Sequence, residues 1–291
     1  MKIINFGSIN IDYVYEMDHF VREKETTSSL SFSKHIGGKG LNQSIACKKA
    51  GIDVIHAGMI GEDGKFILKY LQENNIDTKY IKCISKPTGH AIIQNCRGEN
   101  SIIIEHGANY AIDNEYIDFI LNKCNKDNII LIQNEISNID YLIKKAYEKE
   151  IPIYFNVAPC DKTVLEYPLN LVSTLIVNEI EAQELTNCSS NNYEDILDCL
   201  EKKFINQEIL LTVGRDGAFY SNNKKRIYQK AYSVTAIDST AAGDTFIGFF
   251  ISSIIKGYEV KDALNIASKA SSVTIQKKGA SNSIPSWSDI I

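Results

Sequence analysis

One segment of the chain combines a carboxylate with small residues at the start of an apolar helix. Residues 238–248 read Asp-Ser-Thr-Ala-Ala-Gly-Asp-Thr-Phe-Ile-Gly, and apolar residues recur after them at helical spacing. A helix N-terminus offers N–H groups without partners and a partial positive charge, so it binds anions. Ala242 and Gly243 leave room for a phosphate, and Asp244 can take a proton from a hydroxyl beside it. The segment predicts phosphoryl transfer to an alcohol; alternatively, Asp244 only complements the helix dipole.

A second group of polar residues carries the kinds of side chain that bind sugars. Asn10 and Asp12 follow the first apolar run, Asn42 lies in the glycine-rich segment 37–43, and Glu135 follows a later strand. Sugar hydroxyls both donate and accept, so amides and carboxylates suit them as partners. Taken singly, Asp12 can instead be a turn former and Glu135 a loop acid.

The common nucleotide signatures are absent from the sequence, so other segments must hold a nucleotide. Neither G-x-x-x-x-G-K-[ST] nor G-x-G-x-x-G occurs. Asn178 can contact a phosphate and Glu181 can hold a metal through water, or the two can form a capping pair. Residues 211–217 form either a ligand crevice or a tight turn. Carbonyls of the polar loop 277–283, with Asp238, could ring a monovalent cation, or the loop is an ordinary chain end.

The elements that must position these residues alternate between strand and helix. Such alternation, with apolar strands, implies a parallel sheet covered on both faces. Residues 81–105 interrupt the alternation and, with 13–36, predict a small separate sheet. The predicted strands are 2–8, 53–57, 128–133, 152–156, 173–177, 208–213 and a pair across 217–231, with 226–237 also alternating as a strand does. The predicted helices are one opened by 37–40 and closed by Gly51, one from Asp63 to about 74, and 113–123, 138–149, 179–186, 193–203, 241–256 and 260–276.

Composition narrows the function classes. The chain has 291 residues and a formal net charge of −5 without a basic tract, which argues against a nucleic-acid partner. No apolar run approaches the roughly 18 residues of a membrane span. The seven cysteines contain no C-x-x-C pair, which predicts reduced thiols and a cytoplasmic location. The five histidines are scattered, which argues against zinc.

In their order along the chain, these motifs resemble the ribokinase-like (PfkB-type) carbohydrate kinases. The matching segments are 7–12, 37–43, 178–181, 212–214, 241–246 and 278–280, together with 88–91, 98–104, 107–109 and 133–135. The resemblance covers nearly the whole chain. It implies an α/β fold, a three-layer α/β/α sandwich with a mostly parallel central sheet and a small β-sheet lid. One kinase domain would span residues 1–291, with the lid formed by about 12–36 and 88–107.

The resemblance also implies roles for individual residues. Asp244 would be the base, and the N–H groups of Ala241, Ala242 and Gly243 would form an anion hole. The sugar would be held by Asn10, Asp12, Gly38, Lys39, Asn42, Glu135 and Asp244. The ATP site would be lined by Asn178, Thr212, Gly214, Gly217, Gly243 and Ser268. Glu181 would place Mg²⁺ through water. A K⁺ site would be formed, largely through main-chain oxygens, by Asp238, Thr240, Thr274, Lys277, Gly279 and Ser283.

The activity implied by the resemblance is ATP-dependent phosphorylation of a sugar's primary hydroxyl, with D-ribose giving ribose 5-phosphate. The alternatives are a kinase for another furanose, deoxyribose or a nucleoside, and a non-catalytic sugar-binding regulator. Pairing of lids between subunits would make a homodimer.

Overall fold

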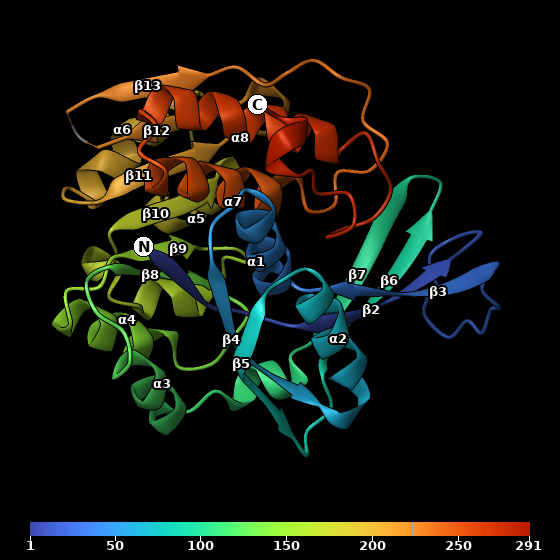
Figure 1. Ribbon diagram of the computed structural model, residues 1–291. Coiled ribbons are helices and arrows are strands. Elements are labelled where there is room, and N and C mark those ends of the chain that lie inside the picture. Colours follow the sequence, from blue (N-terminus) through green and yellow to red (C-terminus); the bar gives the residue numbers. More distant parts are fainter. Residues whose placement is uncertain (223) are drawn as a thin grey trace.

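The computed structural model describes residues 1–222 and 224–291; Asn223, inside the strand pair predicted across 217–231, lies outside the described residues. In the described part, helices cover both faces of a nine-stranded sheet, and a four-stranded sheet projects from one side (Figure 1). This arrangement confirms the three-layer α/β/α class with its small additional sheet.

The main sheet is parallel except at one edge. Its strand order is β13-β12-β11-β10-β9-β8-β1-β4-β5, and β12 and β13 are the strands that pair in antiparallel fashion. The strands are β1 (Lys2–Phe6), β4 (Val54–Gly61), β5 (Asp77–Ile84), β8 (Asn128–Gln133), β9 (Ile153–Asn156), β10 (Thr174–Asn178), β11 (Glu208–Thr212), β12 (Ala218–Ser221) and β13 (Arg226–Gln229).

Strand β8 shows why the sequence gives a sheet covered on both sides. Its side chains alternate between two hydrophobic clusters: Ile130 and Ile132 belong to one, Ile129 and Leu131 to the other. Because both faces are buried, the strand reads as a continuous apolar run.

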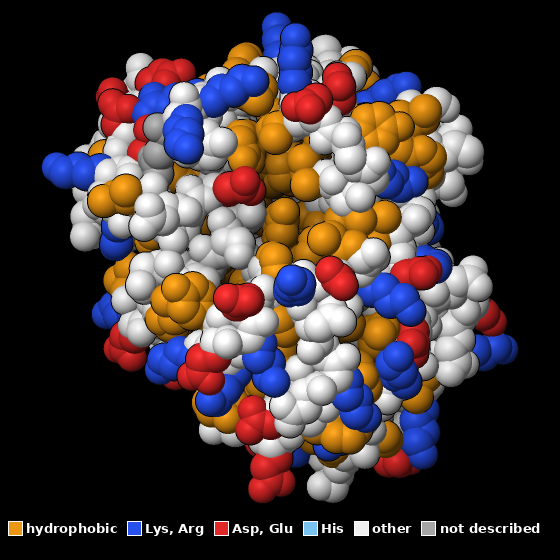
Figure 2. Space-filling view, turned by 60° about the vertical axis from the view of Figure 1, so that its left-hand side comes forward, with side chains coloured by type: hydrophobic (Ala, Val, Ile, Leu, Met, Phe, Trp, Pro, Cys, Tyr) orange, Lys and Arg blue, Asp and Glu red, His pale blue; other side chains and the backbone are white. Residues whose placement is uncertain are grey.

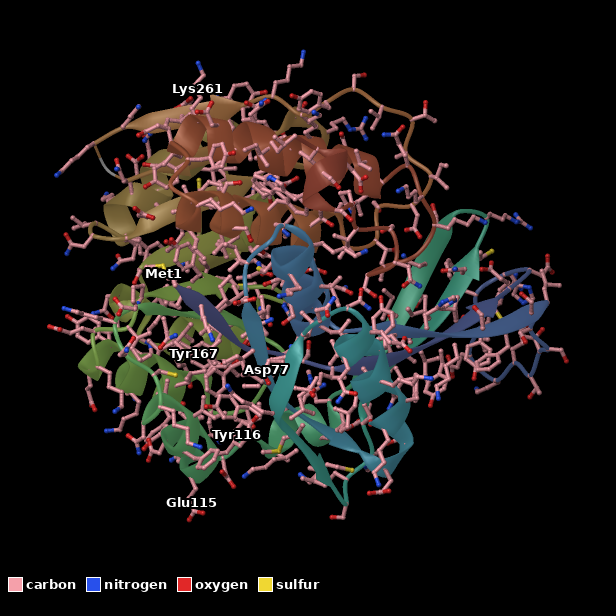
Figure 3. All side chains as sticks on the ribbon, in the orientation of Figure 1. Met1, Asp77, Glu115, Tyr116, Tyr167 and Lys261 are labelled. Carbon is pink, nitrogen blue, oxygen red and sulfur yellow. The ribbon has the colours of Figure 1, made fainter. Side chains whose placement is uncertain are left out.

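The helices form the two outer layers. Residues of α3, α4, α5 and α6 pack into one cluster, and residues of α1, α2, α7 and α8 into the other. The helices are α1 (Lys39–Lys49), α2 (Lys65–Glu73), α3 (Asn114–Leu121), α4 (Ile139–Glu148), α5 (Glu179–Thr186), α6 (Tyr193–Lys203), α7 (Ala242–Ile255) and α8 (Val260–Thr274). Helix α3 is typical of the outer layers: Tyr116 is buried, whereas the adjacent Glu115 points outward (Figure 3).

The smaller sheet has the order β3-β2-β6-β7. Its strands are β2 (Asn10–Glu16), β3 (Ser31–Gly37), β6 (Gly89–Cys96) and β7 (Glu99–Glu105). Only three residues separate β1 from β2, so the chain passes directly from the main sheet into the smaller one. Asn10 and Asp12 therefore lie at the junction of the two sheets.

Two secondary-structure predictions were wrong. Residues 81–84 lie in β5, which pairs with β4 at the edge of the main sheet, so they do not begin the smaller sheet. One face of this edge strand is largely exposed and polar, which hides the apolar pattern of a buried strand. In the other case, residues 230–237 are not in a strand, and β13 ends at Gln229.

The surface charges and the lengths of the helices can be described directly. Basic and acidic side chains are interspersed on the face shown in Figure 2, so the described part of this face lacks a continuous basic surface. None of the helices in the described part of the chain has the length and apolar character needed to traverse a lipid bilayer.

Candidate active site

Helix α7 begins at the residues that the sequence singled out. Ala241 is its N-cap residue and adopts a left-handed conformation with φ 59°. The N–H of Ala242 donates to the Ser239 carbonyl at 3.2 Å, so this predicted anion-hole donor is engaged within the turn. A Cβ added to Gly243 would meet no atom within 4 Å. The helix start is therefore open to a ligand at Gly243.

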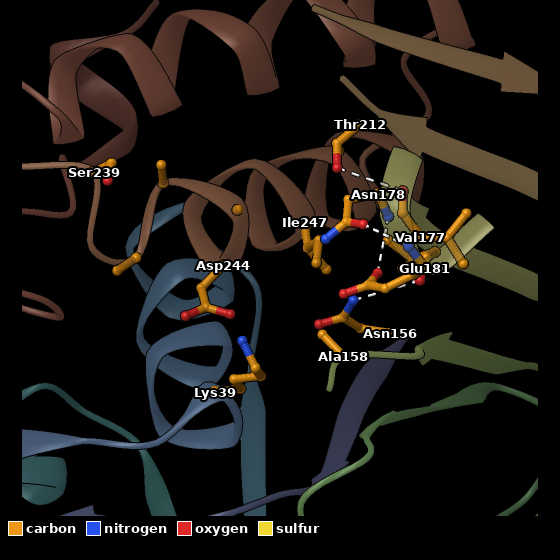
Figure 4. Close-up of a pocket in the computed structure, with 14 residues that line it drawn as sticks. Lys39, Asn156, Ala158, Val177, Asn178, Glu181, Thr212, Ser239, Asp244 and Ile247 are labelled. Atoms are coloured by element: carbon orange, nitrogen blue, oxygen red, sulfur yellow. Dashed lines mark hydrogen bonds between the residues drawn. The ribbon is translucent and has the colours of Figure 1, made fainter. Parts of the chain in front are cut away.

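Asp244 lies one residue further, buried against helix α1. Its Oδ2 accepts a hydrogen bond from Asn42 Nδ2 at 3.0 Å, and its Oδ1 accepts one from Gln43 Nε2 at 2.9 Å. Burial raises the pKa of Asp244, while the Lys39 charge and these two hydrogen bonds oppose the rise. The Lys39 amine points toward this carboxylate (Figure 4). A buried carboxylate with a raised pKa suits a proton acceptor.

The Lys39 ammonium is the positive charge of this site. Burial alone would lower the pKa of Lys39, but the carboxylates of Asp244, Glu135 and Glu181 outweigh it and raise the pKa. Lys39 therefore stays protonated among three acids.

The predicted sugar-binding residues come together beside Asp244. Glu135 Oε2 accepts from the Lys39 N–H at 3.1 Å and from the Ser8 hydroxyl. Asn10 Oδ1 accepts from Asn109 Nδ2 at 2.7 Å. The Glu135 contacts join the loop after β8 to the start of α1 and to the loop before β2, and the Asn10 contact joins β2 to the segment Gly107–Ala111.

Asn42 has a side-chain acceptor without a partner, and Asp12 has a raised pKa. Asn42 Oδ1 is buried without a hydrogen-bond partner. Burial, and then the charge of Glu135, raise the pKa of Asp12 to about 6. A buried acceptor such as Asn42 Oδ1 is costly unless a donor meets it, and sugar hydroxyls are such donors.

Glycines bring the backbone close to the predicted sugar-binding side chains. A Cβ on Gly37 would lie 2.0 Å from Asp12 Oδ2, and one on Gly38 would lie 2.9 Å from the Ser8 carbonyl oxygen. Gly38 also has φ 100°, which favours glycine. A side chain at position 37 would displace Asp12, and one at position 38 would press on the backbone of Ser8 and Asn10.

A pocket of about 230 Å³ adjoins the Asp244 carboxylate (Figure 4). Its walls come from the starts of α1, α5 and α7 and the ends of β9, β10 and β11, where a parallel sheet binds ligands. The lining includes Lys39, Asn156, Asn178, Glu181, Thr212, Ala241, Ala242, Gly243 and Asp244.

Asn178 and Glu181 form the capping pair that the sequence offered as an alternative, and they also line the pocket. Asn178 Oδ1 accepts from the Glu181 N–H at 2.8 Å, and Glu181 Oε2 accepts from the Asn178 N–H at 2.9 Å. Burial raises the pKa of Glu181. Among the described residues, no three His, Cys, Asp or Glu side chains gather into a metal-binding group, so a cation here would need water or phosphate oxygens as well.

Three predicted nucleotide residues lie outside the pocket lining. Gly214 has φ 52°, and a Cβ there would meet nothing within 4 Å. Gly217 has φ 120°, and a Cβ there would approach the Gln229 carbonyl oxygen to 2.0 Å, so it is needed for packing against β13. Ser268 is buried on α8.

The residues predicted for a K⁺ site occupy neighbouring loops. The Asp238 carboxylate accepts from the Thr240 N–H at 2.9 Å and from the Gly279 N–H at 2.9 Å. The Lys277 N–H donates to the Thr274 carbonyl, and the Ser283 hydroxyl donates to the Ala280 carbonyl. Asp238 thus ties the loop before α7 to the loop after α8.

Sequence reasoning missed four polar residues of this site. Gln43 donates to Asp244, and Asn109 donates to Asn10. Asn156 accepts from Gln43 at 3.1 Å, and Gln133 donates to Gln43 at 2.7 Å. Three of them stand in segments that carried the resemblance. For these three, the available signal was a position within two residues of Asn42, Glu135 or Gly107.

Comparisons with known proteins agree with one another. The family model described as pfkB family carbohydrate kinase matches residues 1–287. A ribokinase of Staphylococcus aureus (strain COL) is 33% identical, with 98% of this chain and 96% of the relative aligned. The structure of Arabidopsis thaliana ribokinase complexed with ribose and ATP superposes with a TM-score of 0.87 at 27% identity, over 99% of this chain and 97% of that one. A Cryptococcus neoformans ribokinase in complex with ADP gives 0.85 at 28% identity, over 99% and 98%.

Proposed function

Because the chain belongs to the pfkB family of carbohydrate kinases, we propose that it transfers the γ-phosphoryl group of ATP to the primary hydroxyl of D-ribose. The observation that carries the proposal is the position of Asp244, a buried carboxylate between an open helix N-terminus and a polar group with an unpartnered acceptor at Asn42. The ribokinases among its relatives and structural neighbours favour ribose as the acceptor and ATP as the donor.

Asp244 acts as the general base. Its carboxylate takes the proton of the hydroxyl while the hydroxyl oxygen forms a bond to the γ-phosphorus and the bond from that phosphorus to the ADP oxygen breaks. The N–H groups of Ala241 to Gly243 stabilise the transferring group. For Ala242 this requires exchange of its bond to Ser239.

The sugar is held by the polar group beside this base. Asn42 Oδ1 and the Asp12 carboxylate accept from hydroxyls, while Asn10, Gly38, Lys39 and Glu135 complete the enclosure. The raised pKa of Asp12 supports this role. Burial removes water from around the carboxylate, and a hydroxyl that donates a hydrogen bond would stabilise it in place of that water.

The nucleotide occupies the pocket. Asn178, Thr212 and Gly243 line the pocket, and Gly214, Gly217 and Ser268 extend the nucleotide site toward the adenine of ATP. Glu181 fits Mg²⁺ through water, because its buried carboxylate lines the pocket; when bound, Mg²⁺ neutralises phosphate charge. Carbonyl oxygens around Asp238, Thr240, Thr274, Lys277, Gly279 and Ser283 suit K⁺.

The four-stranded sheet acts as a lid over the sugar within a single kinase domain, and lid closure excludes water. Its exposed apolar side chains support pairing of two lids in a homodimer: Leu30, Phe32, Ile102, Ile103 and Ile104 are all more than 40% exposed. The cytoplasmic location and the lack of a nucleic-acid partner stay predictions.

Steady-state assays with ribose, 2-deoxyribose, fructose and adenosine as acceptors test the proposal. We expect ADP release that depends on sugar, with the highest kcat/KM for ribose, and dependence on Mg²⁺ and on K⁺. Equal kcat/KM for all four acceptors would contradict the choice of ribose, and absence of ADP release would leave a sugar-binding regulator.

The variant Asp244→Asn tests the mechanism. The new amide NH2 group faces the donor of either Asn42 or Gln43. The Asn42 amide can rotate so that its unpartnered oxygen accepts from that group. We therefore expect a folded protein whose kcat falls by roughly two to four decades, with weaker sugar binding in calorimetry. Turnover near the wild-type value would exclude Asp244 as the base.

A further inference from the structure

A series of buried side-chain hydrogen bonds leads from Asp244 into the protein interior, away from the pocket. Gln43 Nε2 donates to Asp244 Oδ1 at 2.9 Å, and Gln133 Nε2 donates to Gln43 Oε1 at 2.7 Å and to Asn5 Oδ1 at 3.1 Å. Asn5 Nδ2 donates in turn to the Ser44 hydroxyl at 2.8 Å. Together with His56, these residues form what we call the polar chain: Gln43, Gln133, Asn5, Ser44 and His56. All five have exposed fractions of 0%.

The far end of the polar chain has one consistent set of proton positions. Ser44 accepts from Asn5, so its single hydroxyl proton is available for His56 Nδ1, 2.8 Å away. His56 Nε2 then carries the ring proton and donates to the Gly7 carbonyl at 3.1 Å. Burial lowers the pKa of His56 to about 4, which keeps the ring neutral. The polar chain therefore holds no charge of its own near neutral pH.

The directions of the amides follow from these partners. Gln133 uses its amide hydrogens on two carbonyl oxygens, those of Gln43 and Asn5. Rotating the Gln133 amide would place oxygen against oxygen at both contacts. Its own Oε1 is buried without a partner, a cost of about 1–3 kcal/mol, so the neighbours impose this orientation. With its oxygen taken by Gln133, Gln43 turns its N–H groups to Asp244 and to Asn156.

We propose that the polar chain positions Asp244 for proton abstraction, by holding Gln43 with its N–H toward the carboxylate so that the carboxylate keeps one orientation at the sugar hydroxyl. The proposal rests on the proposed kinase function. The members of the polar chain are positioning residues, because Gln43 is the only one of the five that touches Asp244. Among the described residues, Lys39 is the charged side chain that acts on Asp244, and Glu135 and Glu181 act on Lys39.

Two variants interrupt the polar chain at different depths. Gln43→Leu removes the donor to Asp244, and Ser44→Ala removes the link between Asn5 and His56. Ser253→Ala is the matched control, because Ser253 is equally buried and its hydroxyl donates to the Phe249 carbonyl at 2.8 Å, far from the polar chain in sequence and bonding.

The readouts are kcat, KM for ribose, and the pH dependence of kcat/KM. We expect kcat to fall about 100-fold in Gln43→Leu, the effect of a misplaced catalytic group, and roughly 3- to 10-fold in Ser44→Ala, with little change in Ser253→Ala. The acid limb of the profile moves to higher pH in Gln43→Leu, because the carboxylate loses a donor. His56→Asn, which restores an acceptor for Ser44, keeps more activity than His56→Leu.

Several results would overturn the proposal. One is a kcat of Ser44→Ala equal to that of Ser253→Ala. Another is an acid limb of the kcat/KM profile that is the same in Gln43→Leu as in wild type. If Gln43→Leu does not fold, Gln133→Leu, which leaves the Gln43 carbonyl without its donor, takes its place under the same criteria. If the wild type phosphorylates no sugar, the proposed function fails separately. The titration of the Asp244 carboxyl carbon, followed by NMR without substrate, then decides: identical titration in wild type and Gln43→Leu overturns the positioning role.

Discussion

Gly248 of α7 and Ala46 of α1 lie so close that a Cβ at position 248 would come within 2.4 Å of the Ala46 Cβ. One helical turn earlier on each helix are Asp244 and Asn42, which are joined by a 3.0 Å hydrogen bond. The spacing of the two helices at Gly248 therefore sets the distance between the base and its amide partner.

Gly248→Ala is expected to destabilise the protein, because the added methyl group overlaps the backbone and side chain of α1. Overpacking of this kind costs about 1–3 kcal/mol. We expect a lower urea midpoint and a lower kcat, because separating the helices lengthens the Asn42–Asp244 bond. Unchanged unfolding and unchanged kcat would show that the crossing is not rigid.

Gly243→Ala provides the opposite case in the same helix. A Cβ at this position would meet no atom within 4 Å, and alanine in place of a helical glycine stabilises by up to about 1 kcal/mol. The same Cβ narrows the approach to the helix N-terminus. We expect thermal unfolding at or above the wild-type temperature together with a kcat at least about tenfold lower. A variant as active as wild type would exclude a phosphoryl group at this N-terminus.

The sequence predicted those parts of the site that depend on local structure. The small residues before an apolar helix located the start of α7 and Asp244, and the glycines at 37–40 located the start of α1. Asn178 and Glu181 also lie at a helix start, as expected. A helix N-terminus leaves a signal in a few neighbouring residues, so a single sequence suffices to find it.

The polar chain depends on tertiary packing and could not be predicted in this way. Gln43 and Asp244 are 201 residues apart in sequence, and Gln133 and Asn5 are 128 apart. Their contacts follow from the approach of α7 to α1 and from the neighbouring positions of β8 and β1 in the sheet. Strand β5 escaped prediction for a different reason, since an edge strand with an exposed face lacks a buried strand's pattern.

Asp12 predicts an unusual dependence of stability on pH. Burial and Glu135 raise its pKa from 3.8 to about 6. Between these values the folded carboxyl keeps a proton that the unfolded one has lost, so the folded state binds more protons and the free energy of unfolding falls as pH rises. Above about pH 6 the fall in the free energy of unfolding is complete. A pKa difference of about two units corresponds to at most about 3 kcal/mol.

The variant Asp12→Asn has no carboxyl group at this position, so its free energy of unfolding should not fall with pH in this way. We expect urea unfolding to show a variant about 1–3 kcal/mol more stable than wild type at pH 7.5 and nearly equal to it at pH 3.5, while calorimetry shows weaker ribose binding. Asp127→Asn, at an exposed carboxylate, serves as the control. A stability difference that does not vary with pH would contradict the shifted pKa of Asp12.

Glu181→Gln separates the capping function of Glu181 from its proposed function in placing Mg²⁺. A glutamine oxygen can still accept from the Asn178 N–H, so helix α5 keeps its capping interaction. The negative charge facing the pocket is lost, and we expect KM for the Mg²⁺–ATP complex to rise about 10- to 100-fold, the usual effect of losing an outer-sphere metal partner. Raising the Mg²⁺ concentration should recover part of the activity. Glu179→Gln, in the same first helical turn but outside the pocket lining, controls for the helix dipole. Equal KM values in the two variants would remove Glu181 from the metal site.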